Sequence, residues 1–131
     1  MLGRELSSLF PAKPQVPKQT QEPVLVVRGL SAPGVNRVSL DIRPGEIVGL
    51  AGLVGAGRSE IAHAIFGSTP RFAGEITIDG RPLEHGVRAS LANGLFLIPE
   101  SRKDQALFLA RSIRDNVSIS NLSLFARALW I

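Results

Sequence analysis

The sequence predicts an α/β fold that includes an antiparallel β unit, and three observations support this prediction. An apolar run at residues 47–51 leads into a glycine-rich loop at 52–57 and then into a helical pattern. Two strand-like stretches precede that run, at residues 24–27 and 35–43. A third alternating stretch, at 74–80, follows the helical pattern. A buried strand, a loop and a helix in that order are typical of an α/β sheet, whereas alternation is typical of antiparallel strands with one solvated face.

The elements before the loop are predicted to be three strands. Residues 24–27 are apolar and β-branched-rich, and in residues 35–43 the side chains of Val38, Leu40 and Ile42 alternate with polar neighbours. Pro44-Gly45 predicts a turn after the second strand. The run 47–51 contains no polar residue, so we expect a strand that is buried on both faces.

A helix is predicted directly after the loop. Ile61 and Ile65 are four residues apart, as are Ala62 and Phe66, so each pair lies on one helical face. Gly67 stands where a left-handed residue would close the helix.

Three further elements are predicted between this helix and residue 98. Residues 74–80 alternate as a half-exposed strand that ends in an Asp-Gly turn. Residues 88–93 predict a short helix closed by Gly94. Residues 95–98 predict a second strand of the buried type.

The last element is a helix expected over residues 112–121. Ser112 is its expected N-cap, and Ile113, Val117 and Ile119 are expected on its buried side. Several large apolar residues, the last of them Ile131, stand at the end of the sequence, and we expect that the sequence stops inside a further helix.

Composition excludes several function classes. The sequence of 131 residues contains no cysteine, so disulfides and thiolate zinc sites are excluded. The net charge is +4, but the arginines are scattered and tyrosine is absent, so we expect no nucleic-acid binding. The longest apolar run, 47–57, is shorter than the roughly 20 residues that a membrane helix needs.

The glycine-rich loop predicts a phosphate site. Its sequence fits the pattern G-x-x-x-x-G-K-[ST] at every defined position except the lysine. Glycines allow the backbone to turn its N–H groups inward, and the N-terminus of the following helix attracts anions. The hydroxyl of the motif binds Mg²⁺. The predicted phosphate loop comprises Gly52, Leu53, Val54, Gly55, Ala56, Gly57, Arg58 and Ser59, with Ser59 as the metal ligand.

Two residues make this site unusual. Arg58 replaces the lysine, and its longer planar guanidinium is expected to place a γ-phosphate poorly. Glu60 stabilises an empty helix N-terminus but opposes a bound triphosphate. The alternative interpretation is a glycine-rich turn that binds nothing.

The order of these elements resembles the first half of the nucleotide-binding domain of ABC transporters. More narrowly, the chain resembles the second such domain of sugar-importer ATPases of the ribose, galactose and xylose type. This likeness rests on Gly-Ala-Gly-Arg-Ser-Glu at 55–60, Leu-Ala-Asn-Gly at 91–94 and Ile-Pro-Glu-Ser-Arg-Lys at 98–103. The resemblance implies the N-terminal half of a P-loop NTPase (ABC ATPase) core.

The resemblance also implies a division of the chain. Residues 1–23, which are rich in proline, correspond to the linker between the two domains of that family. Residues 24–131 correspond to a partial nucleotide-binding domain that lacks the signature loop, the Walker B acids and the switch histidine. No catalytic residue is therefore expected here, and the fragment alone is expected to be inactive.

Within this resemblance Glu100 is a further site residue. It occupies the position where many ABC domains have a glutamine that senses the γ-phosphate and the membrane subunit. A glutamate only accepts hydrogen bonds, so its handling of metal and water would differ. Residues 101–106 would then face the transmembrane partner.

The function implied by the resemblance is that of the ATP-binding component of a sugar importer. The cofactors would be ATP and Mg²⁺ at a weak or degenerate site. The partners would be a second nucleotide-binding domain, transmembrane permease subunits and, indirectly, a periplasmic sugar-binding protein. The location would be peripheral, on the cytoplasmic side of the cell membrane. The alternative is an interaction module that braces a partner ATPase domain without hydrolysis.

Overall fold

A computed structural model of the chain describes residues 21–119. Most of the expected linker and the apolar end of the sequence therefore lie outside the described residues. The elements are β1 (Leu25–Ala32), β2 (Val35–Ile42), α1 (Arg58–Phe66), β3 (Ala73–Ile78), β4 (Arg81–Pro82), α2 (Val87–Ala92), the π-helical turn η1 (Arg102–Ala106) and α3 (Ile113–Ser118).

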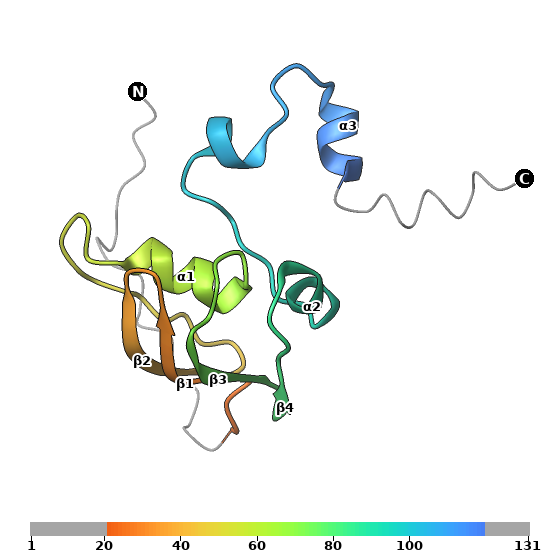
Figure 1. Cartoon of the computed structure of the whole chain (residues 1–131). Coiled ribbons are helices and arrows are strands. Elements are labelled where there is room, and N and C mark those ends of the chain that lie inside the picture. Colours follow the sequence, from red (N-terminus) through yellow and green to blue (C-terminus); the bar gives the residue numbers. More distant parts are fainter. Residues whose placement is uncertain (1–20, 120–131) are drawn as a thin grey trace, which may run out of the picture.

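The four strands form one antiparallel sheet in the order β2-β1-β3-β4 (Figure 1). Val27 of β1 is opposite Leu40 on one side and Ile76 on the other. The predicted Asp-Gly turn joins β3 to β4: Asp79 has a φ of 49° and Gly80 a φ of 72°. Two successive positive φ angles are typical of a tight hairpin turn, so this prediction is confirmed.

Strand β1 is longer than the predicted stretch because it contains a bulge. Leu25 and Val27 are buried, and after a register shift Leu30 and Ala32 are buried on the same face. Gly29, with a φ of 59°, lies inside the shift. The extra residue shifts the alternation of buried and exposed side chains by one position. The second half of the strand therefore does not continue the two-residue pattern of the first half.

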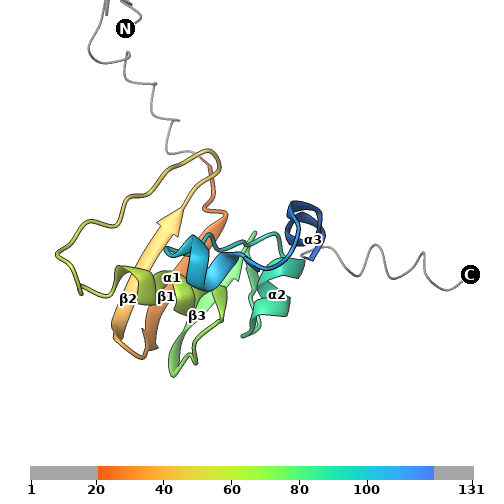
Figure 2. The ribbon, with the colours of Figure 1, turned by 90° about the horizontal axis from the view of Figure 1, so that it is seen from above.

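Helix α1 contacts β1 and β2 and lies across the sheet (Figure 2). Ala64 is fully buried, and Ile61 and Ile65 pack against the core beside it. Gly67 closes the helix in the left-handed conformation and donates its N–H to the His63 carbonyl oxygen. The predicted helix and its cap are therefore confirmed.

The short helix predicted at 88–93 is α2. Asn93 follows its last residue, and Gly94 has a φ of 76° and donates its N–H to the Leu91 carbonyl oxygen at 3.1 Å. Ser90 is fully buried on the side that faces α1. Within residues 21–119 no helix is both long and apolar enough to span a bilayer.

The prediction of two buried strands is wrong. Residues 47–51 and 95–98 form no strand, and Ile47 and Ile98 are 98% and 92% exposed. A buried strand needs neighbours on both edges and layers on both faces. In the described part of the chain neither segment pairs with the sheet, although Leu95 packs against the core.

The prediction for the last helix is partly confirmed. The Ser112 hydroxyl accepts the Asp115 N–H at 3.2 Å, so Ser112 is the N-cap of α3. Ile113 and Val117, however, are 85% and 71% exposed, and Ile119 is also exposed. The expected buried side is wrong because α3 stands away from the sheet (Figure 1). Residues 120 and 121 lie outside the described range.

Candidate functional site

The glycine-rich loop folds back on itself as an open turn. The Ala56 N–H donates to the Leu53 carbonyl oxygen at 3.1 Å, and Gly55 has a φ of 82°. The Leu53 and Val54 side chains are 85% and 98% exposed. The loop is thus neither extended nor sealed in the interior, and these two side chains face solvent.

Helix α1 begins directly after this turn. Gly57, with a φ of 81°, is the N-cap, and its carbonyl oxygen accepts the Ile61 N–H at 3.0 Å. No side chain caps the helix. The N–H groups of a first helical turn have no partner within the helix, and they favour an anion together with the helix dipole.

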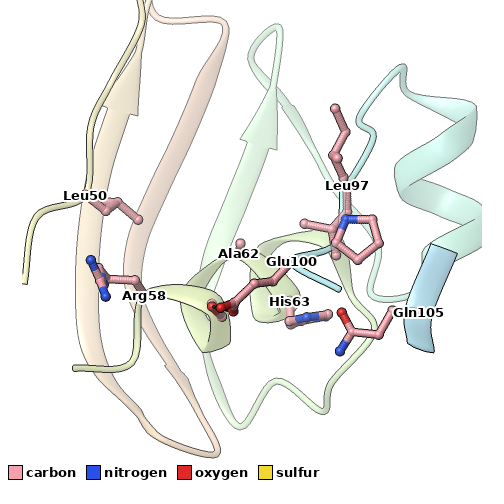
Figure 3. Close-up of a pocket in the computed structure, with 10 residues that line it drawn as sticks. Leu50, Arg58, Ala62, His63, Leu97, Glu100 and Gln105 are labelled. Carbon is pink, nitrogen blue, oxygen red and sulfur yellow. Dashed lines mark hydrogen bonds between the residues drawn. The ribbon is translucent and has the colours of Figure 1, made fainter. Parts of the chain in front are cut away.

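A cavity of about 440 Å³ lies beside the first turns of α1 (Figure 3). It brings the N-terminal part of this helix together with the segment that precedes η1. In Figure 3 Arg58 and Glu100 lie over the start of α1, and His63 and Gln105 lie further along. The lining residues are Leu50, Arg58, Ser59, Ala62, His63, Leu97, Ile98, Pro99, Glu100 and Gln105.

One hydrogen bond between lining residues of this cavity joins Ser59 to Glu100. The Ser59 hydroxyl donates to Glu100 Oε2 at 3.2 Å, although the two residues are 41 positions apart. A hydroxyl and a carboxylate are oxygen ligands of the kind Mg²⁺ uses, and Mg²⁺ completes its shell with water and substrate phosphates. Within residues 21–119 no group of three or more His, Cys, Asp or Glu side chains is placed to hold a metal. The pair therefore fits Mg²⁺ that arrives with a phosphate, rather than a site that holds the ion alone.

Glu60 lies on another side of the helix start. Its Cγ is 3.3 Å from the point that a β-carbon on Gly34 would occupy, so its side chain lies against the turn between β1 and β2. Gly57 contacts the same turn, because a β-carbon on it would be 3.0 Å from the Gly34 carbonyl oxygen. The hairpin turn therefore supports the start of α1.

The cavity includes only some of the residues predicted from the sequence. Arg58, Ser59 and Glu100 line it, whereas residues 52–57 form the turn before it. From the sequence, no role was expected for His63 and none individually for Gln105. Residues four apart share a helical face, so the spacing of His63 from Ser59 was a signal that could have found it. Gln105 gave no comparable signal.

Comparison with known proteins identifies the family of the chain. The sequence profile described as "ABC transporter" matches residues 35–129. The chain belongs to the ABC transporter family. The predicted α/β fold of that family's ATPase core, with an antiparallel β sheet, is therefore confirmed.

Relatives within the ABC transporter family are similar along almost the whole chain. A protein of Rhizobium etli named "Putative ribose/galactose/methyl galactoside import ATP-binding protein 1" is 44% identical over 133 residues, which cover 100% of this chain. "Ribose import ATP-binding protein RbsA 1" of Streptomyces coelicolor is 44% identical, and "Ribose import ATP-binding protein RbsA 2" of Streptomyces avermitilis is 45% identical, each over 98% of the chain. The chain spans 25% of the length of each of these relatives.

Proposed function

We propose that this chain is part of the ATP-binding component of an ABC-type sugar importer. The observation that carries the proposal is the open turn at residues 52–57 that leads into the start of α1, which no side chain caps. The cavity that Arg58, Ser59 and Glu100 line lies beside it. The names of the relatives support ribose, galactose or a similar sugar as the cargo. In the intact parent, ATP binding and hydrolysis would drive sugar uptake, and the catalytic acid would come from sequence other than residues 1–131.

Each site residue has a proposed role toward ATP. N–H groups of residues 52–59 other than that of Ala56 hold the phosphates, and Arg58 attracts them by its charge. Ser59 and Glu100 hold Mg²⁺, which would neutralise phosphate charge when it is bound. Glu60, which lies against Gly34, weakens the affinity by its negative charge.

The surroundings of the domain are proposed from the family. Residues 1–23 would be a linker between two nucleotide-binding domains, and residues 24–131 would be the first part of the second one. The partner nucleotide-binding domain of the parent and the permease subunits would be the direct partners. A periplasmic sugar-binding protein would be an indirect partner, and nucleic acid would not bind. The assembly would place this chain at the cytoplasmic face of the membrane.

A second candidate function is a bracing module that holds nucleotide statically or not at all. The contact between Ser59 and Glu100 favours it, because the hydroxyl that would hold Mg²⁺ already has a partner. The arginine in place of the lysine favours it too, since a planar guanidinium cannot reproduce the compact charge of an ammonium group.

Sugar uptake by cells that carry the parent importer tests the two functions. The test variant is the double change Arg58→Ala with Ser59→Ala, and the control is Arg81→Ala, which removes an exposed arginine on β4. The parent with only this site intact is also assayed for magnesium-dependent ATP turnover.

The two functions predict opposite results. Loss of uptake in the double variant, together with turnover at this site, supports the ATPase function. Uptake equal to that of the Arg81 variant, without turnover at this site, supports the bracing module and overturns the ATPase function for this site.

A further inference from the structure

Three charged side chains surround the start of α1. Arg58 carries one positive charge, whereas Glu60 and Glu100 carry one negative charge each. Arg58, Glu60 and Glu100 are all exposed, so their charges are in contact with solvent. These three side chains together carry a net charge of −1, although the sequence pattern of the loop predicts that it binds phosphate.

The position of Glu100 makes it the more important of the two acids. Its carboxylate accepts a hydrogen bond from Ser59 at 3.2 Å, whereas Glu60 lies against Gly34 of the hairpin turn. Glu100 therefore occupies the place from which a cation held by the Ser59 hydroxyl would be reached.

We propose that Glu100 is a specificity-determining residue that rejects metal-free nucleoside triphosphates and admits only their complexes with a divalent cation. The inference rests on the proposed function, because it assumes that triphosphates bind at residues 52–59. Without a cation, the carboxylate repels the phosphates and keeps the Ser59 hydroxyl engaged. With Mg²⁺, the same carboxylate becomes an attractive ligand of the incoming ion.

A purely structural role for the Glu100 charge is disfavoured by the segment that follows it. The Ser101 hydroxyl accepts the Asp104 N–H at 3.3 Å, and the Gln105 N–H donates to the Ser101 carbonyl oxygen at 3.1 Å. The Leu107 N–H donates to the Arg102 carbonyl oxygen at 2.9 Å. These bonds hold η1 without Glu100, so an amide at position 100 would leave the turn intact and keep a partner for Ser59.

The test measures ATP binding to the full 131-residue chain by calorimetry, once with excess MgCl₂ and once with EDTA. We expect Glu100→Gln to strengthen metal-free ATP binding by about tenfold, the size expected when one charge is removed a few ångströms from an anion in a partly solvated site. We expect the same variant to weaken the magnesium-dependent binding or leave it within about threefold, since the amide oxygen can still contact the ion. The magnesium dependence of the affinity would therefore shrink.

Two further variants separate charge from other causes. Glu84→Gln removes an equal charge from an exposed residue outside the cavity, and we expect unchanged affinity in both conditions. Ser59→Ala removes the hydroxyl but keeps the carboxylate, so metal-free binding should not improve. An equal gain in the Glu84 variant, or no gain in the Glu100 variant, would overturn the role of Glu100 while the proposed function stands. No ATP binding by the unchanged chain in either condition would instead overturn the proposed function and the role of Glu100 with it.

Discussion

The Ser90 hydroxyl donates a 2.8 Å hydrogen bond to the Phe66 carbonyl oxygen. This bond joins α2 to the last residue of α1, 24 positions earlier, and the Ser90 side chain is fully buried. Because α1 carries Arg58 and Ser59 at its other end, the bond helps to fix the helix that presents the candidate site.

We expect Ser90→Ala to destabilise the chain by about 1–3 kcal/mol, because the Phe66 carbonyl oxygen would lose its partner in a buried place. Urea unfolding followed by circular dichroism measures this change. Ser68→Ala is the matched control: its hydroxyl also donates to an α1 carbonyl oxygen, that of His63, but at an exposed position. We expect the control to stay within about 0.5 kcal/mol. Equal losses of stability in the two variants would show that the buried hydrogen bond contributes no more than the exposed one.

The contact between β3 and β1 depends on the absence of a side chain at Gly74. A β-carbon there would lie 2.6 Å from the Leu30 Cα and 2.7 Å from the Arg28 carbonyl oxygen. We expect Gly74→Ala to cost more than about 3 kcal/mol, from overpacking and from strain at a φ of 98°. Gly80 has a φ of 72°, and a β-carbon there would have no atom within 4 Å. We therefore expect Gly80→Ala to lower the free energy of unfolding by only about 1–2 kcal/mol. Thermal unfolding compares the two, and a smaller loss for Gly74→Ala would contradict the close approach of the strands.

The ion pair between Arg28 and Asp41 joins β1 to β2 and makes stability depend on pH. Hydrogen bonds from the Arg28 guanidinium, one of them 3.2 Å long, lower the pKa of Asp41 below its ordinary value. The stabilisation is therefore complete above the ordinary value of about 3.9, and it is lost as the pH falls through the lower folded-state value. We expect Asp41→Asn to flatten the acid limb of the stability profile below about pH 4, with less difference in high salt because the pair is exposed. Urea midpoints across pH at two salt concentrations test this, and identical acid limbs would refute it.

Local signals in the sequence were reliable where the structure depends on a few neighbouring residues. The Asp79-Gly80 turn, the Gly67 cap and the Ser112 cap each follow from the backbone freedom or the hydroxyl of the residue itself. Burial was not predictable in the same way. Residues 47–51 have the composition of a buried strand, but burial depends on neighbours that the apolar pattern does not report.

At the candidate site, too, local features could be predicted from the sequence and contacts between distant residues could not. The turn before α1 was expected from its glycines, and the position of Glu100 near the phosphate loop was expected from the family resemblance. The hydrogen bond between Ser59 and Glu100 could not be predicted from spacing, because the two residues are 41 positions apart. Their proximity depends on how the chain between them folds.

Exposed apolar side chains beside the site predict a weakly cooperative molecule. Ile47, Val54 and Ile98 are all more than nine-tenths exposed. We expect the 131-residue chain alone to bind an apolar dye and to unfold over a broad temperature range. Changing these three residues to lysine should lower dye binding and leave the circular dichroism spectrum unchanged, since they contribute little to the core. A sharp cooperative transition of the unchanged chain would contradict this expectation.

Substitution of two glycines in the phosphate loop allows the effect of backbone conformation to be measured separately from the effect of steric contact. Gly55 and Gly57 have φ angles of 82° and 81°, so an alanine at either position pays the same conformational penalty of about 1–2 kcal/mol. A β-carbon at Gly55 would meet nothing within 4 Å, whereas one at Gly57 would lie 3.0 Å from the Gly34 carbonyl oxygen.

We therefore expect Gly57→Ala to shift the start of α1 away from the hairpin turn by a few tenths of an ångström. We expect this variant to weaken magnesium–ATP binding about threefold more than Gly55→Ala does, because binding groups must be held within about 0.5 Å of their productive positions. Calorimetric titration of both variants measures the difference. Equal affinities would mean that the contact with Gly34 does not position the loop, and a larger loss in the Gly55 variant would mean that the exposed turn itself holds the phosphates.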